Sequence, residues 1–296
     1  MRDLPIYGID EFSDIKFTYA FYANILKEHL IDHQFVNSPH KHSTYISILF
    51  TTGYGEHQID FDTYEVKPGS VFLISPGQVH NWKLSENADG FVFFHTKEFY
   101  DQMYSSKQIE DYPFFYLQQN YPVIHLQEEN LEQFSRLFSE IVKEYKSNLP
   151  YKWEKIGVLL DYTYIELARI YHVDPNNGQT FTSNSIKVKK LQKLIDDHFK
   201  THKFPKDYAD WMNITTRHLS RICRDVLNKS TNDLIIERVV MEAKRMLVHQ
   251  DVSVSQVGDE LGYSDYSHFV RLFKQKVGVT PKAFQLSSLI TEKHLS

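Results

Sequence analysis

The chain has 296 residues, of which 42% are hydrophobic and 24% are charged, so it can bury two ordinary cores. Its one cysteine, Cys223, excludes an intramolecular disulfide framework and a cysteine zinc cluster. The N-terminus MRDLPIYGIDEF lacks the apolar core of a signal peptide, and no apolar run is long enough to span a bilayer. We therefore expect a cytoplasmic protein with no membrane partner.

The net charge of −5 is unevenly distributed along the chain. Residues 186–296 hold 19 Lys and Arg against 13 Asp and Glu, whereas residues 1–185 hold 14 against 25. A basic C-terminal module can attract the phosphates of a nucleic acid, whereas an acidic N-terminal module is repelled by them. The asymmetry predicts two domains. An ordinary solvated surface would account for the basic excess by itself, and the excess indicates nucleic-acid contact only together with the two motifs described below.

The N-terminal third contains short β-prone runs separated by glycine and proline, which is typical of a sandwich or barrel. These runs are 35–50, 55–61, 64–66, 71–75 and 91–95. Two segments, PHKH at Pro39 to His42 and GSVFLISPGQVHNW at Gly69 to Trp82, resemble the two cupin motifs. The resemblance implies a cupin-like β-barrel.

Metal-binding cupins hold an ion with histidines from these two motifs, and the matching residues are His40, His42 and His80. Three imidazoles could bind Fe, Mn, Ni or Zn. The enzymes also carry a glutamate shortly after the first pair, where this chain has Ser-Thr-Tyr-Ile at 43–46. We therefore expect no metal and no cofactor, and interpret the three histidines as pocket-lining or hydrogen-bonded core residues.

A barrel interior is a natural small-molecule site, because alternate residues of each strand point inward. Imidazoles and flat aromatic rings suit a sugar or another polar ring, through directed hydrogen bonds and stacking. We expect an effector pocket lined by His40, His42, Tyr45, His80, Trp82, Phe93 and His95. The alternative that each of these residues simply packs in the core stays open.

Two helices are predicted after the barrel, at 128–147 and 153–171, because each carries an apolar stripe of helical period. They can pack on the barrel, form a dimer contact, or do both. The segment 173–185 is rich in Asn, Ser, Thr and Gly without helical period, and reads as a linker.

The C-terminal part contains two helix-turn-helix patterns. In the second, Val254, Val257 and Leu261 follow a helical period, Gly262 marks a turn, and the period resumes from Phe269 to Val277. Gly278 fits a left-handed helix cap. The first pattern lies about fifty residues upstream, at 207–230, with its turn at 213–215.

The run GYSDYSHFVRLFKQKVGVTPKAF closely resembles the C-terminal signature of the AraC/XylS family of bacterial transcription regulators. That family carries two such motifs within roughly a hundred residues, and its sensor domains contain the cupin motifs described above. The resemblance implies a homodimer that binds double-stranded promoter half-sites, responds to a small molecule and can contact RNA polymerase. A helix at 230–250 is expected to hold the DNA-reading helices of the two motifs about 34 Å apart, near one turn of DNA.

Carried over from the family, the residues that face DNA lie on the second helix of each motif. They are Arg217, Ser220, Arg221 and Arg224 in the first motif, and Ser267, His268, Arg271 and Lys274 in the second. Arginine can bond guanine bidentately, whereas Arg224, Lys274 and Lys276 are expected to meet phosphates. The alternative for Arg221 is an ion pair with Asp225, one helical turn away.

Two residues depart from the family pattern: Cys223 replaces a core phenylalanine, and Gly258 replaces an alanine. A glycine in a helix costs about 1 kcal/mol relative to alanine. We expect a looser DNA-binding domain from these two changes.

The predicted fold is α+β and multidomain. We expect a cupin-like sensing domain with an N-terminal arm at 1–127, a helical dimerisation region at 128–172, a linker at 173–185 and an all-α double helix-turn-helix domain at 186–296. The predicted function is sequence-specific transcription regulation controlled by an effector, not enzymatic catalysis. Two alternatives remain from the sequence: a metal-dependent cupin enzyme with an attached DNA-binding module, and a regulator whose barrel only dimerises.

Overall fold

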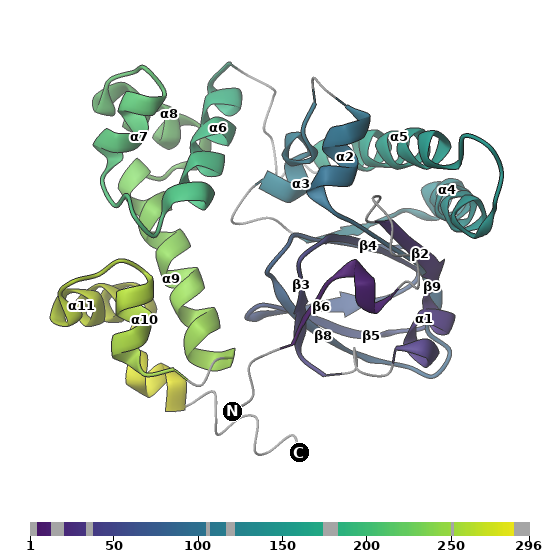
Figure 1. Cartoon of the computed structure of the whole chain (residues 1–296), viewed down its shortest axis with the longest axis horizontal. Helices are drawn as coiled ribbons and strands as arrows, with labels where there is room; N and C mark the ends of the chain where they lie inside the picture. The colour runs from purple at the N-terminus through teal and green to yellow at the C-terminus, as the bar shows by residue number, and fades with distance from the viewer. Residues whose placement is uncertain are drawn as a thin grey trace. The chain divides into compact units, whose positions relative to one another are not determined.

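The computed structural model describes residues 5–12, 21–33, 38–104, 107–116, 122–173, 183–249 and 252–286 (Figure 1). The chain forms two compact units, one within Pro5–Gly178 and one within Gln179–Ser296. The first unit is rich in strands, and the described part of the second contains only helices. Residues 174–182 of the predicted linker lie outside the described residues, whereas its ends, residue 173 and residues 183–185, belong to helices.

The N-terminal unit is built from two five-stranded sheets. The strands of one sheet are, in spatial order, β1 (Ile6–Tyr7), β3 (His40–His42), β8 (Val79–Leu84), β5 (Gly55–Ile59) and β6 (Asp62–Val66). Those of the other are β10 (Val123–His125), β7 (Ser70–Ile74), β4 (Tyr45–Thr52), β9 (Asp89–His95) and β2 (Phe21–Ile25). All pairs are antiparallel except β1 with β3.

One hydrophobic core lies between the two sheets. Alternation along β4 and β9 points Ile46, Ile48 and Phe94 into this space, where they meet Ile59 of β5 and Trp82 of β8. Because both sheets contribute to one cluster, they face each other as the walls of a flattened barrel. The fold class predicted for this half of the chain is confirmed.

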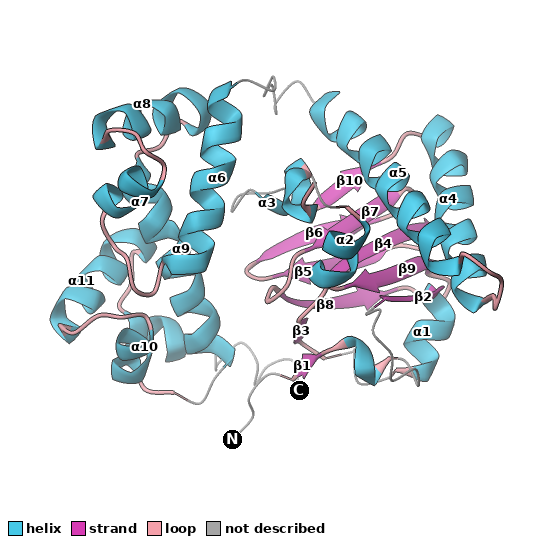
Figure 2. Cartoon of the chain, turned by 45° about the horizontal axis from the view of Figure 1, so that its top comes forward, coloured by secondary structure: helices cyan, strands magenta, loops and turns pink. Residues whose placement is uncertain are grey.

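A second core lies on the other face of the β4 and β9 sheet, under helices α4 (Glu128–Lys146) and α5 (Lys152–Val173) (Figure 2). Phe93 of β9 contacts Phe138 of α4, with ring centroids 4.9 Å apart. Both helices lie where their apolar stripes predict them. The shorter helices of this unit are α1 (Leu26–Asp32), α2 (Lys97–Met103) and α3 (Pro113–Tyr116), with 3-10 turns at Ile9–Glu11 and Ile109–Asp111.

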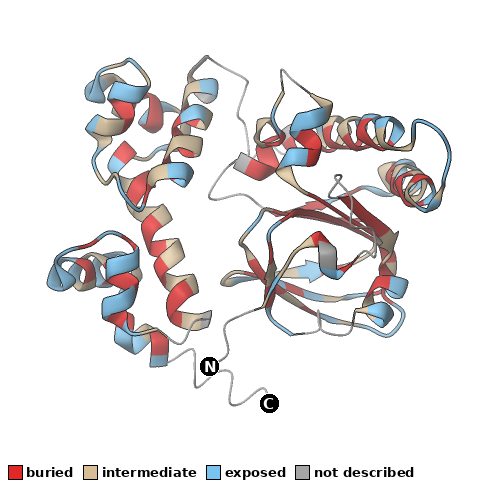
Figure 3. Ribbon diagram, in the orientation of Figure 1, coloured by how far each residue is buried: buried red, intermediate tan, exposed pale blue. Residues whose placement is uncertain are grey.

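The C-terminal unit is a helical domain with a single core. Its helices are α6 (Ser183–His198), α7 (Pro205–Trp211), α8 (Thr216–Leu227), α9 (Thr231–His249), α10 (Val254–Glu260) and α11 (Tyr266–Val277). A further helical stretch covers 281–286. Figure 3 shows buried residues along the inner side of these helices. One apolar cluster of this unit includes Leu191, Leu219, Ala243 and Phe273.

Strands β1, β2, β8 and β10 were not predicted from the sequence. β2 begins with three buried residues, so it lacks the polar alternation of a half-buried strand. β1 and β10 have only two and three residues. The predicted run 35–50 contains two strands, β3 and β4, and its residues 35–37 lie outside the described ranges.

Candidate functional site

The first helix-turn-helix consists of α7 and α8. Its turn contains Asn213, whose φ of 53° lies in the left-handed region that asparagine tolerates. Thr215 caps α8, because its hydroxyl accepts a hydrogen bond from the backbone N–H of His218 at 3.2 Å. At the other end α8 stops at Asn228, which also has φ of 53°. Local sequence therefore fixes both ends of this predicted reading helix.

The second helix-turn-helix consists of α10 and α11. Gly262 in its turn has φ of 77°, and a Cβ there would lie 2.0 Å from the carbonyl oxygen of Lys200, so only glycine fits. Asp265 caps α11: its carboxylate accepts hydrogen bonds from the N–H groups of Ser267 at 2.8 Å and His268 at 3.2 Å. The N-terminus of the second reading helix is thus fixed in place.

Helix α9 joins the two motifs into one body. It contacts α6, α7, α8, α10 and α11, and its 19 residues make it about 28 Å long. Val239 and Ala243 are fully buried in the core that both motifs share. Neither motif can shift relative to the other without opening that core.

The eight predicted DNA-contacting residues are all at least partly accessible on the outer sides of α8 and α11. They are Arg217, Ser220, Arg221 and Arg224 on α8, and Ser267, His268, Arg271 and Lys274 on α11. Within the described part of the chain, none of the five cations among them pairs with a carboxylate. Arg221 donates to Nδ1 of His218 at 3.1 Å, so the alternative pair with Asp225 is not formed. This face offers unneutralised cations.

Lys276 has a different partner from these cations. Its ammonium lies 2.7 Å from the carboxylate of Asp233, which ties α11 to α9. The hydrogen bond from Lys276 lowers the pKa of Asp233 to about 2. Lys276 is therefore held in an ion pair within the domain, whereas the sequence led us to expect it to meet a phosphate.

The two unusual residues, Cys223 and Gly258, are both buried in the shared core. The thiol of Cys223 lies 3.4 Å from the hydroxyl of Thr231 at the start of α9. A Cβ on Gly258 would meet the ring of Phe269 at 3.4 Å, which is ordinary van der Waals contact. The site could therefore accommodate alanine.

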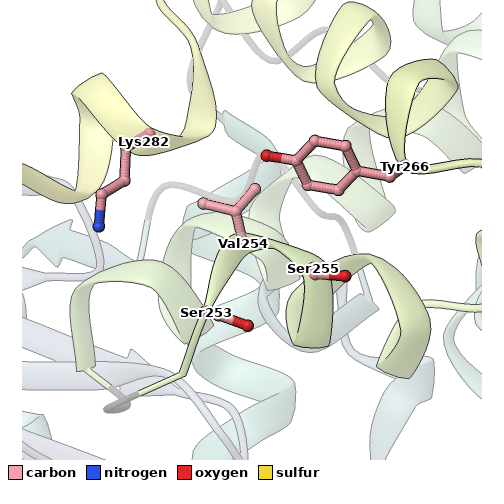
Figure 4. Close-up of a pocket in the computed structure, with 5 residues that line it drawn as sticks. All are labelled: Ser253, Val254, Ser255, Tyr266 and Lys282. Atoms are coloured by element: carbon pink, nitrogen blue, oxygen red, sulfur yellow. The ribbon is translucent and has the colours of Figure 1, made fainter.

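A surface pocket of about 390 Å³ lies beside the second motif (Figure 4). It is lined by Ser253, Val254, Ser255, Tyr266 and Lys282. Tyr266 is half exposed and stands directly before Ser267 and His268 in the first turn of α11. Tyr266 was not among the predicted site residues, although its place in that turn makes it accessible beside them.

Four of the predicted effector residues lie together between the two sheets of the N-terminal unit: His40, His42, His80 and Trp82. His40 and His80 are opposite residues of β3 and β8, and their ring centroids are 4.4 Å apart. His57 of β5 joins them, with its Nε2 3.0 Å from Nδ1 of His80. The sequence analysis missed His57, because a single histidine in a strand carries no distinguishing signal.

The other three, Tyr45, Phe93 and His95, lie on the opposite face of β4 and β9, under the helices. Nε2 of His95 is 2.8 Å from the hydroxyl of Tyr164 on α5, and its Nδ1 donates to the carbonyl of Thr96 at 2.9 Å. The prediction that all seven residues line one pocket is therefore wrong. Phe93 and His95 lie on the face of β9 that packs against the helices, and not on the face that looks towards the opposite sheet.

Burial keeps the inner histidines neutral. Desolvation lowers the pKa of His40 to about 4, of His57 to about 3 and of His42 to about 2, and it lowers the pKa of His80 well below its ordinary value. At pH 7 each ring therefore carries one N–H and one lone pair. Such rings can accept hydrogen bonds or bind a cation.

Two family models match the chain over these same regions. An AraC-like ligand binding domain matches residues 24–148, and a helix-turn-helix domain matches residues 208–287. Together they span more than half of the chain. The chain belongs to the AraC family of transcription regulators.

Two curated regulators and one solved structure align with most of the chain. The uncharacterized HTH-type transcriptional regulator YfiF of Bacillus subtilis is 23% identical over 254 residues, 83% of this chain and 78% of the relative. The arabinose operon regulatory protein of Salmonella typhimurium is 22% identical over 256 residues, 85% of this chain and 86% of the relative. The crystal structure of ToxT from Vibrio cholerae aligns with a TM-score of 0.45 and 12% identity, covering 90% of this chain and 98% of that one.

Membership of the AraC family confirms the predicted class of function, a transcription regulator with a ligand-binding and a DNA-binding domain. The relatives are named as regulators and not as enzymes. Over the described ranges, every helix is too short or too polar to cross a membrane.

Proposed function

We propose that this AraC-family regulator reads DNA with α8 and α11 under the control of a small polar effector bound in its N-terminal unit. One observation carries the proposal: two capped helices on one rigid core expose five cations that no carboxylate of the described residues neutralises. Cations that form no internal ion pairs are available to phosphates and base edges.

The DNA contacts divide by chemistry. We assign base edges to Arg217, Ser220 and Arg221 of the first motif and to Ser267, His268 and Arg271 of the second, with arginine bidentate on guanine. Arg224 and Lys274, nearer the C-terminal ends of α8 and α11, meet phosphates. We assign to helix α9, which is about 28 Å long, the role of holding α8 and α11 about one turn of DNA apart, a length of similar order at about 34 Å.

The effector occupies the space between the sheets, beside His40, His42, His80 and Trp82. Nε1 of Trp82 and one ring nitrogen of each of these histidines are buried without a hydrogen-bond partner. A ligand rich in hydroxyl groups would satisfy such groups, and leaving them unsatisfied costs about 1–3 kcal/mol each. The arabinose operon regulators among the relatives favour a sugar as the class of effector.

The regulator acts as a homodimer through α5. Val158 and Tyr162 lie one helical turn apart on α5 and are exposed, Val158 by 64% of its surface. Leu149 and Tyr151, just before α5, are exposed as well. An apolar row of this kind is a candidate interface. Paired subunits would read repeated promoter half-sites in the cytoplasm and engage RNA polymerase there.

The working domains follow from these roles. Residues 1–127 sense the effector, 128–172 dimerise, 173–185 link the two halves and 186–296 bind DNA. Effector binding would change the relative placement of the two DNA-binding domains of a dimer, and so change which half-sites are bridged.

The test is selection of random duplex DNA by the purified chain at about 150 mM salt, where weak phosphate attraction is largely screened. We expect an enriched motif of two blocks about one helical turn apart. An R221A/R271A variant should lose the enrichment, whereas K67A, which removes an exposed cation of the N-terminal unit paired with Glu65, should retain it. Failure of the unaltered chain to enrich any motif, with or without candidate sugars, would contradict the proposal.

A further inference from the structure

Lys203 lies in the segment between α6 and α7 and bonds the backbone of both halves of the DNA-binding unit. Its ammonium donates to the carbonyl oxygens of Phe199 and Lys200, the two residues that directly follow α6; the bond to Lys200 is 2.9 Å. It also donates, at 2.5 Å, to the carbonyl oxygen of Leu261, the C-terminal cap residue of α10. An ammonium carries three protons, so these three carbonyls engage all of its donors.

The three carbonyls lie at the C-terminal ends of two helices, α6 and α10. Such ends carry carbonyl groups that no helical N–H satisfies, and a cation is stabilised beside them. The ring of Tyr263 adds a favourable contact, with its centroid 4.9 Å from the ammonium. Burial, together with the charge of Lys200, lowers the pKa of Lys203 to about 8, so the ammonium is still mostly protonated at pH 7. One cation therefore joins the two helix ends.

The end of α6 and the turn of the second motif are in close contact at this point. The carbonyl oxygen of Lys200 occupies the space that a side chain would need at Gly262, where a Cβ would lie 2.0 Å from it. Gly262 and Tyr263 belong to the turn that leads into α11, which begins at Tyr266. A shift of this turn relative to α6 would move the start of α11.

Helix α6 is packed in turn on the first reading helix, α8, and on α9. Arg238 of α9 holds the C-terminal end of α6: its Nε lies 2.7 Å from the carboxylate of Asp196, and its guanidinium lies 4.0 Å from the ring centroid of Phe199. Lys203 thus connects the α8 side of the unit to the α11 side by a route outside α9. A single spacer helix leaves rotation about its axis opposed only by side-chain packing, and a second connection opposes that rotation directly.

We propose that Lys203 is a positioning residue for DNA recognition, which fixes the separation of α8 and α11 and thereby the spacing of the two DNA blocks that the unit accepts. Two reading helices on one body contact bases whose spacing follows from the separation of the helices. Lys203 itself contacts no base in this mechanism. The inference rests on the proposed reading of DNA by α8 and α11.

The test compares affinities for three duplexes: the selected one, and two in which the spacer between its blocks is one base pair shorter or longer. We expect the unaltered chain to prefer the selected spacing by about 10-fold or more, and K203M, which removes the ammonium, to reduce this preference to about 3-fold or less. K203R, which keeps a charged donor, should retain most of it. The matched control is K206M, which removes an exposed lysine in the first turn of α7 and should leave the preference unchanged.

An unchanged spacing preference in K203M would overturn the inference. So would an equal loss of affinity for all three duplexes, because Lys203 would then only stabilise the fold. K203Q, whose side chain is polar, shorter and uncharged, is the second variant in case methionine prevents folding, and a folded K203Q that keeps the full preference would likewise contradict the inference. Failure of the unaltered chain to bind the selected duplex would instead contradict the proposed function, and the inference with it.

Discussion

Arg271 illustrates how a single residue is expected to contribute to DNA recognition. It is exposed on α11 and has no carboxylate partner among the described side chains, whereas neighbouring Lys276 is committed to Asp233. The difference between these two cations could not be read from their spacing. It depends on which side chains of α9 the fold brings near α11.

We predict that R271A weakens binding to the selected DNA by about 5- to 150-fold, which corresponds to about 1–3 kcal/mol for a lost bidentate base contact. Fluorescence anisotropy with labelled duplex measures the change. K274A should instead weaken selected and unrelated duplexes alike, because a phosphate contact carries no sequence information. An equal loss on both duplexes for R271A would show that Arg271 contacts only phosphate.

Gly258 allows a stability prediction at the same scale. A Cβ there meets the ring of Phe269 at an ordinary distance, so G258A should raise the free energy of unfolding by about 1 kcal/mol. The control is G262A, where φ is 77° and the Cβ would collide with the carbonyl of Lys200. Urea unfolding should separate the two in opposite directions. Destabilisation by G258A would mean that Phe269 cannot tolerate the added methyl group.

At the scale of elements, the two halves of the chain combine helices differently. In the C-terminal unit, α9 is buried by helices on several sides and serves as a spacer. In the N-terminal unit, α5 buries Leu160 and Tyr164 on the sheet and leaves Val158 and Tyr162 exposed. A stripe that is wider than the sheet can cover leaves apolar surface for a partner.

We predict that V158K weakens self-association by about 10-fold or more, because it places a charge in the proposed interface, and 10-fold corresponds to about 1.4 kcal/mol. Sedimentation velocity over a concentration series measures this. The matched control is Q58K, which adds the same charge at an exposed position of β5. If V158K and Q58K associate like the unaltered chain, the interface lies elsewhere.

At the scale of the whole molecule, charge and acid sensitivity are separated between the units. The basic excess lies in residues 186–296, and the buried histidine cluster lies in the N-terminal unit. The folded-state pKa of His40, about 4, lies below its ordinary value of 6.5 because of burial. The folded state therefore binds fewer protons than the unfolded state below pH 6.5.

We predict that the N-terminal unit loses stability as the pH falls from 6.5 towards 4. Its stability is fully present above 6.5, and each buried histidine removes about 1.4 kcal/mol per pH unit below that value. Thermal unfolding between pH 7.5 and 5, with chelator present to exclude bound metal, measures the effect. A Tm that stays constant over this range would show that the histidines become hydrated before they are protonated.

Much of the DNA-binding half could be predicted from the sequence, because the signals there are local. Gly262 and Gly278 adopt the positive φ expected of turn and cap residues, and Thr215 and Asp265 cap the two reading helices. Such features depend on a few neighbouring residues, so they can be read from the chain alone. The eight candidate contact residues remain a prediction, although their accessibility agrees with it.

The sensor half was harder to predict, because its site is assembled from strands that are distant in sequence. His57 gains its place through the pairing of β5 with β8, which brings it beside His80, 23 residues away. Tyr45, Phe93 and His95 alternate along their strands just as the inner residues do, yet they lie on the face that contacts the helices. A pattern of alternation shows which residues share a face but does not show what that face meets.

The sequence by itself determined the two-domain organisation and the positions of the helices and turns of the DNA-binding half, because composition, charge and capping act over short distances. The class of regulator followed from the resemblance of its motifs to those of the AraC/XylS family. Only the tertiary structure decided which face of β9 looks into the barrel, which cations are neutralised and which histidine nitrogens are left unsatisfied. Those outcomes depend on pairs of residues that the folded sheets and helices bring together from distant parts of the chain.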